Sequence, residues 1–508
     1  MADIVQGNGQ EFGRLRRIFF PLYVYELKKA IPMGFMFFCI LFNYTCLRNI
    51  KDSLIVTGSG SDAEVIPFLK GSCVAPAAIV FILIYTKASN ILTNEHLFYA
   101  TLTPFILFFG CFAFFIYPNF DVLHFSPETI ASWRKAAPEC LKWPIAIIGN
   151  WSCSLFYILA EIWGSALLSL SFWQFANQIT KTSEAKRMYA FFAFMAQMSV
   201  LLEGKVGEWC SDISRKVPAG VDAWGISLKY MMGIVVILGI AAMCTYRWIY
   251  RHVLTDKRFY DKPELPGNTG KNKKKIPLLQ SFKIIFTSFY LGLIVALVVC
   301  YGISVNLVEG LWKKQLGMQY PNSNDYSTFM HQFTFYSGIA SMTVLIIGGN
   351  VIRLCRWFTA AIATPVMLFL LGSSFFIFVL FREHLTAFLL SLSTTPLFCA
   401  VIFGALVVAI SKAVKYALFD LTKEMAYIPL DEDMKVKGKA VVEVVGGRFG
   451  KAGGAWIQFL LLMFLPNADF FTLAPYTFTI FVVICALWMF SVKVLSRRVE
   501  AITTKSQQ

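Results

Sequence analysis

Two basic side chains stand inside a stretch that otherwise looks embedded in a membrane. Arg448 and Lys451 lie three residues apart in GGRFGKAGGAW, where Gly446, Gly450 and Gly454 recur every four residues. Small residues at this spacing let membrane helices approach closely. An ionised side chain in the membrane is costly and usually faces a cavity or a pathway. Lys451, with Arg448 one helical turn away, is therefore a candidate for binding an anion.

A polar stripe crosses the apolar segment NWSCSLFYILAEIWGS. Asn150, Ser154, Tyr157 and Glu161 are spaced by four, three and four residues, so a helix presents them on one face. A structural salt bridge to another helix is one interpretation, and a place on a transport pathway is the other. In either case Glu161 needs a cation or a proton as its partner.

The segment CILFNYTCLRNIKDSLIVT places Asn43, Leu47 and Lys51 on one helical face, with Arg48 turned away from it. Arg48 and Lys51 could simply reach the membrane interface with their long side chains. Alternatively, Lys51 helps to bind an anionic substrate. In the second part of the chain, CYGISVNLVEGLWKKQL carries Glu309 along one helical face with other polar side chains.

These charges could meet in one central cavity. Lys51 and Glu161 from the first half, with Glu309 and Lys451 from the second, form a set that is formally neutral when empty. Such a set could exchange its internal ion pairs for contacts to a polyanion. Gln197, the central amide of the fifth apolar segment, could bond a neighbouring helix or read the edge of a nucleobase.

Motifs of enzymes and metal sites are missing from the sequence. GGRFGKAGG has the wrong spacing for a phosphate-binding loop and lacks its Ser or Thr. The 12 cysteines show no metal-ligand spacing and are interpreted as small buried hydrophobic residues. We therefore expect neither an enzyme nor a cofactor.

The composition predicts the elements that must position these charges. The chain of 508 residues is 57% hydrophobic and only 15% charged, which is typical of an all-α polytopic membrane protein. Apolar segments long enough to span a bilayer as helices can be placed about twelve times. They are 31–49, 66–86, 95–118, 145–177, 186–204, 225–247, 286–311, 327–350, 357–381, 386–411, 439–465 and 470–495.

The loops predict orientation and division into halves. Basic residues gather on the side of both termini, which is cytoplasmic by the positive-inside rule. A six-helix bundle over 1–250, a basic cytoplasmic linker over 251–280 and a second six-helix bundle over 281–508 are expected. The net charge of +16 follows from these loops, so nucleic acid is not an expected partner. We expect a monomer in the lipid bilayer.

Several motifs spread over nearly the whole chain resemble the nucleotide translocators of intracellular bacteria and plastids, the non-mitochondrial ADP,ATP carriers. They are NIKDSLIVT with EVIPFLK, AEIWGS, FANQITKTSEAKRMYAFF, NLVEGLWKKQL with QYPNSNDYS, and YALFDLTKEMAYIPLDEDMKVKGKAVVEVVGGRFGKAGG. The charged residues that matter for transport in the family's motifs correspond to Lys51, Glu161, Glu309 and Lys451.

The resemblance implies a major-facilitator-like transporter of the bacterial inner membrane that works by alternating access. It implies ATP import in exchange for ADP with phosphate. A proton-coupled or exchange importer of more ribonucleoside triphosphates is the alternative, and a carrier of another organic anion comes third. On this view Lys51, Lys451 and Arg448 hold the phosphates. Glu161 and Glu309 form ion pairs with these cations.

Three side chains remain candidates for orienting the base or ribose: Gln197, Asn150 and Tyr157. Gln197 lies where many family members have Asn, and RNIK at 48–51 stands where they have RDTK. These differences leave the preferred base open.

Overall fold

A computed structural model describes most of the chain, and every regular element in the described residues is helical. The described residues are 22–23, 26–58, 60–138, 141–180, 182–218, 220–255, 288–428, 430, 442, 446–465 and 468–507. This confirms the predicted all-α class. Large apolar side chains such as Ile79, Leu83 and Ile84 remain exposed on the outside of the protein, as expected of a surface that faces lipid.

The helices before the linker form what we call the first half. Several predicted spans consist of consecutive helical pieces that continue one another. The elements are α2 (Leu27–Val56), α3 (Val65–Phe68), η2 (Leu69–Val74), α4 (Ala75–Ser89), α5 (Asn94–Cys111), η3 (Phe112–Ile116), η4 (Tyr117–Asn119), α6 (Phe120–Leu123), α7 (Pro127–Ala136), α8 (Lys142–Gly149), α9 (Trp151–Trp163), η6 (Gly164–Trp173), α10 (Gln174–Ile179), α11 (Thr182–Arg215) and α12 (Ala223–His252).

The helices after the linker form the second half. They are α14 (Phe289–Gln319), α15 (Ser323–Leu354), α16 (Trp357–Leu380), α17 (Arg382–Ser391), α18 (Pro396–Val414), η7 (Lys415–Phe419), α19 (Asp420–Tyr427), α21 (Gly447–Phe464) and α22 (Phe470–Gln507). Residues 256–280 of the predicted linker lie outside the described residues. The three-part division of the chain therefore stays a prediction.

The number of spans differs from the sequence prediction. Among the described residues, nine helices are long and apolar enough to cross a membrane. The predicted spans 186–204, 327–350 and 439–465 coincide with α11, α15 and α21, which are not among the nine. The apolar part of α21, Ala452–Phe464, is shorter than a full span.

Two predicted spans begin later than their hydropathy suggests. The predicted span 145–177 is broken at Asn150, whose φ of −105° and ψ of 46° separate α8 from α9. The predicted span 386–411 is broken between α17 and α18, where Ser393 has a φ of 55°. Thr395 then caps α18 by accepting a hydrogen bond from the Phe398 amide. Capping and backbone turns, which hydropathy does not register, set these boundaries.

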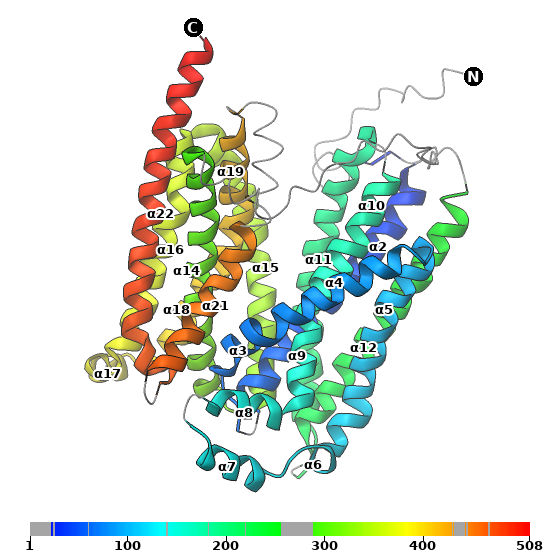
Figure 1. Cartoon of the computed structure of the whole chain (residues 1–508), viewed down its shortest axis with the longest axis vertical. Helices are drawn as coiled ribbons and strands as arrows, with labels where there is room; N and C mark the ends of the chain where they lie inside the picture. Colours follow the sequence, from blue (N-terminus) through cyan, green and yellow to red (C-terminus); the bar gives the residue numbers. More distant parts are fainter. Residues whose placement is uncertain are drawn as a thin grey trace.

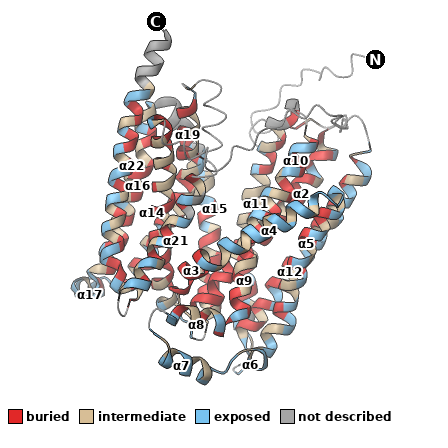
Figure 2. Cartoon of the chain, in the orientation of Figure 1, coloured by how far each residue is buried: buried red, intermediate tan, exposed pale blue. Residues whose placement is uncertain are grey.

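Figure 1 shows the two halves as two groups of long helices. The start of α2 and the C-terminal part of α22 lie at the same end, and the ribbons of the halves diverge toward it. The short helices α7 and α17 lie at the opposite end, which we call the distal end. Buried residues in Figure 2 run along the sides of helices that face other helices.

Packing of α14 against α21 depends on glycine. A Cβ atom on Gly302 would lie 2.4 Å from the carbonyl carbon of Gly450, and one on Gly454 would lie 2.5 Å from Asn306 Cβ. The backbones therefore approach within a distance that only glycine permits at these positions. The predicted role of the four-residue glycine spacing is confirmed at Gly450 and Gly454.

Candidate functional site: a charged network between the halves

Lys51, near the distal end of α2, is the centre of a buried ion-pair arrangement. Its Nζ lies 2.8 Å from Asp52 Oδ1 and 2.9 Å from Glu161 Oε1 on α9. The ammonium also lies 4.0 Å from the centre of the Tyr157 ring. Two carboxylates and an aromatic face thus hold a cation whose side chain is only 2% exposed.

The pairing continues from the first half into the second. Lys313 Nζ on α14 lies 2.9 Å from Asp52 Oδ2 and 3.0 Å from Glu309 Oε1. Glu309 is also 3.6 Å from the Arg48 guanidinium on α2. The six side chains form what we call the charged network: Arg48, Lys51, Asp52, Glu161, Glu309 and Lys313.

The charged network is neutral and open at its ends. Three cations balance three carboxylates. The central Asp52 is 1% exposed, whereas Glu161 is 29% and Arg48 36% exposed. Buried pairs must compensate one another to be tolerated in a low dielectric. The exposed ends can exchange partners with a ligand more easily than the centre can.

Two lysines near the network, Lys70 and Lys412, form no ion pair with a carboxylate among the described residues. Lys70 lines a pocket together with Glu309 and Lys313. Lys412 is repelled by Arg48 and attracted by Glu309. Its Nζ lies 5.2 Å from the centre of the Phe333 ring. The surroundings of the neutral network therefore carry excess positive charge, which suits a polyanion.

The structure brings together three of the four charges predicted to share one site. Lys51 and Glu161 form a direct ion pair, and Glu309 belongs to the same network. Lys451 and Arg448 lie on α21, but their side chains are outside the described part of the chain. Their roles stay predictions.

The position of Arg48 differs from the one predicted from the sequence. Helical spacing predicts that Arg48 points away from the face of Lys51, yet its guanidinium contacts Glu309 across the boundary between the halves. Asp52, which pairs with Lys51 and Lys313, is a further member of the network, and its only signal in the sequence is its position directly after Lys51. Lys313 was visible as the cation one turn after Glu309, but its partner Asp52 lies far away in sequence.

The candidates for base and ribose contacts occupy different places. Tyr157 is fully buried against Lys51, and its hydroxyl has no hydrogen-bond partner among the described residues. Asn150 is buried at the break between α8 and α9, where its Nδ2 lies 3.4 Å from the Ala146 carbonyl. Gln197 is partly buried in the middle of α11. Within the described residues, no hydrogen bond joins Asn150 or Gln197 to the charged network.

A second ionic contact joins the halves at the distal end. Lys314 on α14 pairs with Asp62 and, at 3.1 Å, with Glu64 before α3. Glu64 Oε1 also accepts a hydrogen bond of 3.1 Å from the Phe470 amide at the start of α22. Like the charged network, this contact must be broken if the halves part at the distal end.

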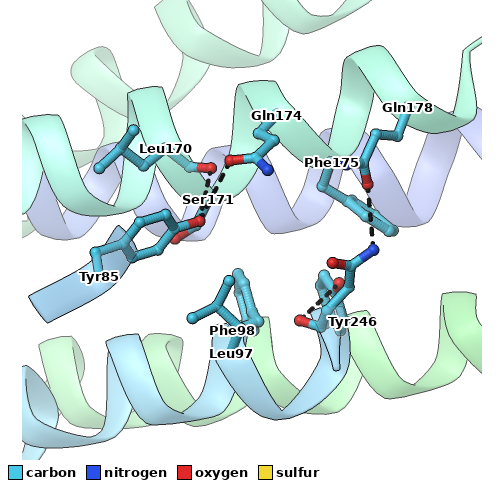
Figure 3. A pocket seen from close by; sticks show the side chains of 10 residues that line it. Tyr85, Leu97, Phe98, Leu170, Ser171, Gln174, Phe175, Gln178 and Tyr246 are labelled. Carbon is cyan, nitrogen blue, oxygen red and sulfur yellow. Dashed lines mark hydrogen bonds between the residues drawn. The ribbon is translucent and has the colours of Figure 1, made fainter. Parts of the chain in front are cut away.

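A separate hollow lies within the first half (Figure 3). Its lining contains amides and aromatic rings but no cationic side chain. Tyr85 donates weakly to Gln174, and Asn94 to Gln178, at 3.3 and 3.4 Å. Without a cation this hollow does not suit a polyphosphate. The lining residues are Tyr85, Asn94, Leu97, Phe98, Leu170, Ser171, Gln174, Phe175, Gln178 and Tyr246.

Solved structures of membrane transporters share this fold. A bacterial homologue of the iron transporter ferroportin, crystallised in an inward-facing state, superposes with a TM-score of 0.60 at 10% identity. The match covers 94% of this chain and 100% of that one. The nucleoside transporter NupG superposes with a TM-score of 0.54 at 11% identity, covering 92% and 99%. These likenesses confirm a major-facilitator-like fold.

Similar sequences come from two bacteria and a plant. ADP,ATP carrier protein 1 of Chlamydia pneumoniae is 48% identical, with 96% of this chain and 94% of that protein covered. ADP,ATP carrier protein 1 of Rickettsia conorii is 44% identical with 99% of both covered. The chloroplastic protein of that name from Arabidopsis thaliana is 43% identical, over 96% of this chain and 76% of that one. The model of the TLC ATP/ADP transporter family matches residues 5–499, so this chain belongs to that family of membrane transporters.

Proposed function

We propose that this protein imports ATP across the bacterial inner membrane in exchange for ADP, with phosphate accompanying the ADP. Support comes from its membership of the ATP/ADP transporter family and from relatives of nearly equal length that carry the name ADP,ATP carrier. The observation that carries the proposal is the neutral charged network between the halves, flanked by lysines without carboxylate partners.

Lys70 and Lys412 receive the phosphates in this proposal, with Lys51, Lys451 and Arg448. Lys70 extends from the first half and Lys412 from the second, so a bound polyphosphate can draw charge from both. Lysine is a compact point charge that binds phosphate in many proteins, and a low dielectric strengthens the attraction. The ligand then favours one arrangement of the halves by its differential affinity.

Glu161 and Glu309 compete with the nucleotide for the same cations. In the empty carrier they occupy Lys51, Lys313 and Arg48. The nucleotide must displace these pairs, beginning at the exposed ends of the network. Because Lys51, Lys313 and Arg48 have internal partners when the site is empty, the charged network itself stays neutral in the unloaded carrier.

Gln197, Asn150 and Tyr157 orient the base or ribose. Tyr157 is covered by Lys51 in this structure, so it becomes accessible to the ligand only after Lys51 moves from its ring. Amide side chains such as Gln197 carry both a donor and an acceptor, as recognition of a base edge requires.

The protein acts as a monomer with both termini in the cytoplasm. The start of α2 and the C-terminal part of α22 lie at one end of the molecule in Figure 1, as an even number of crossings requires. The basic loops assign that end to the cytoplasm. The distal end then faces outward.

Uptake into proteoliposomes tests the function directly. Labelled ATP should enter vesicles preloaded with ADP and phosphate much faster than empty vesicles, and unlabelled ATP or ADP should compete. Uptake that needs a proton gradient and accepts GTP or UTP equally would instead support the broader triphosphate importer. A complete lack of competition by ATP would contradict nucleotide transport.

Lys451→Ala should abolish ATP uptake because a cation that contacts the phosphates is lost. Lys87→Gln, on the exposed end of α4, is the control for removal of a positive charge. Protein abundance in the membrane should be the same for both variants. Uptake near the wild-type level in Lys451→Ala would remove this residue from the site.

A further inference from the structure

A polar cluster apart from the charged network joins the halves where α11 meets α15. Glu203 on α11 and His331 on α15 are both fully buried, with Glu203 Oε1 2.8 Å from His331 Nδ1. Asn49 Nδ2 on α2 lies 3.3 Å from both Glu203 oxygens and donates at 3.0 Å to Thr334 Oγ1 on α15.

Glycines on α11 make this contact possible. A Cβ atom on Gly207 would lie 2.1 Å from His331 Nδ1 and 2.4 Å from its Cε1. A Cβ on Gly204 would lie 2.8 Å from the His331 carbonyl oxygen and from the Phe335 amide nitrogen. The imidazole therefore occupies the space where any other residue at position 207 would place its side chain.

We infer that this seam, formed by Glu203, Gly204 and Gly207 against His331, is a latch that stabilises closure of the distal end in the protein without nucleotide. Three observations support it: complete burial, hydrogen bonding across the halves, and a close approach that depends on glycine. The inference rests on the proposed function because only a carrier that alternates must part α11 from α15.

Opening of the latch breaks several polar contacts between the halves. Parting the helices breaks the contact of His331 Nδ1 with Glu203 and the hydrogen bonds that Asn49 Nδ2 donates to Glu203 and Thr334. Further contacts around it open at the same time. Arg215 lies 2.8 Å from Asp325, Gln332 donates to Glu208 at 2.8 Å, and Ser227 donates to Asn324 at 2.7 Å.

Hydrogen exchange of the full-length protein in lipid nanodiscs, without nucleotide, tests the latch. Gly207→Ala should speed amide exchange in 200–215 and 323–338 by about fivefold or more, because the methyl group displaces His331 and the closed state loses population. Gly233→Ala on α12 is the matched control, since a Cβ there meets nothing within 4 Å. Equal exchange in the two variants would overturn the latch.

A double-mutant cycle separates the latch from general misfolding. In a His331→Ala background the imidazole is gone, so adding Gly207→Ala should change the exchange rate by less than about twofold, within the scatter of independent sites. An equally large effect of Gly207→Ala in both backgrounds would show that the clash with His331 is not its cause, and would overturn the proposal.

Hydrogen exchange tests the latch independently of the proposed substrate. Exchange rates of the empty protein do not depend on which anion is carried, so a protein that fails to transport ATP can still confirm the latch. Conversely, ATP uptake with unchanged hydrogen exchange in Gly207→Ala would keep the proposed function and remove the latch.

Discussion

Lysines without carboxylate partners are expected to determine affinity for the phosphates. Lys70→Gln or Lys412→Gln should raise the KM for ATP about tenfold to hundredfold, the scale of one lost charge-assisted contact. The maximal rate of ATP uptake should change less than the KM. Initial uptake rates at graded ATP concentrations measure this, with Lys87→Gln as the control. Wild-type KM values in both variants would place the phosphates elsewhere.

The contact between Asp52 and Lys313 offers a test of pairing between the halves. Asp52→Asn leaves Lys313 and Lys51 with fewer anions, and Lys313→Gln leaves Asp52 with one cation fewer. Removing one partner of a buried pair costs about 3–5 kcal/mol in soluble proteins. We therefore expect either single variant to unfold at a lower temperature in detergent.

The double variant Asp52→Asn with Lys313→Gln restores neutrality and should recover part of the lost stability. Additive losses would contradict a direct interaction of the two side chains. The cycle thus tests whether Asp52 and Lys313, 2.9 Å apart, form an ion pair that links the first half to the second.

At the scale of helices, packing of α14 on α21 controls the position of Glu309 and of Lys451. Gly302→Ala places a methyl group against the Gly450 backbone, which cannot give way as a flexible side chain can. We expect a loss of about 1–3 kcal/mol, the usual cost of overpacking. Melting curves in detergent should show the loss for Gly302→Ala and not for Gly233→Ala.

For the whole molecule, a ligand held by both halves should stabilise the fold more than one that contacts a single half. ATP and ADP should raise the unfolding temperature, by an amount equivalent to about 2.7 kcal/mol at about 100 times the Kd. Adenosine, which lacks phosphates, should raise it much less. Thermal unfolding of wild type and Lys412→Gln measures this, and equal stabilisation by adenosine and ATP would contradict a site built for phosphate.

The contacts that join the halves at the distal end are expected to open together. The pairs of Lys314 with Asp62 and Glu64, the charged network and the latch all join the halves toward this end. In the proposed alternating mechanism, in which two rigid halves rock against each other, these contacts are expected to form or break together.

Much of the fold followed from the sequence because membrane insertion obeys local rules. Apolar length predicted helices at nearly every span, and the glycines of 446–454 predicted a close helix contact that the structure confirms at Gly450 and Gly454. Ionised side chains in apolar segments are costly enough to mark function without any partner in view. Lys51, Glu161 and Glu309 were identified on that basis.

Only the tertiary structure decided which charges are partners. Asp52 pairs with Lys313 across 261 positions, Arg48 turns toward Glu309, and Glu203 meets His331 through a gap left by Gly207. Periodicity places a side chain on a face of its own helix but carries no information on which helix packs against that face. Whether a lysine such as Lys412 keeps a partner therefore depends on the docking of the two halves.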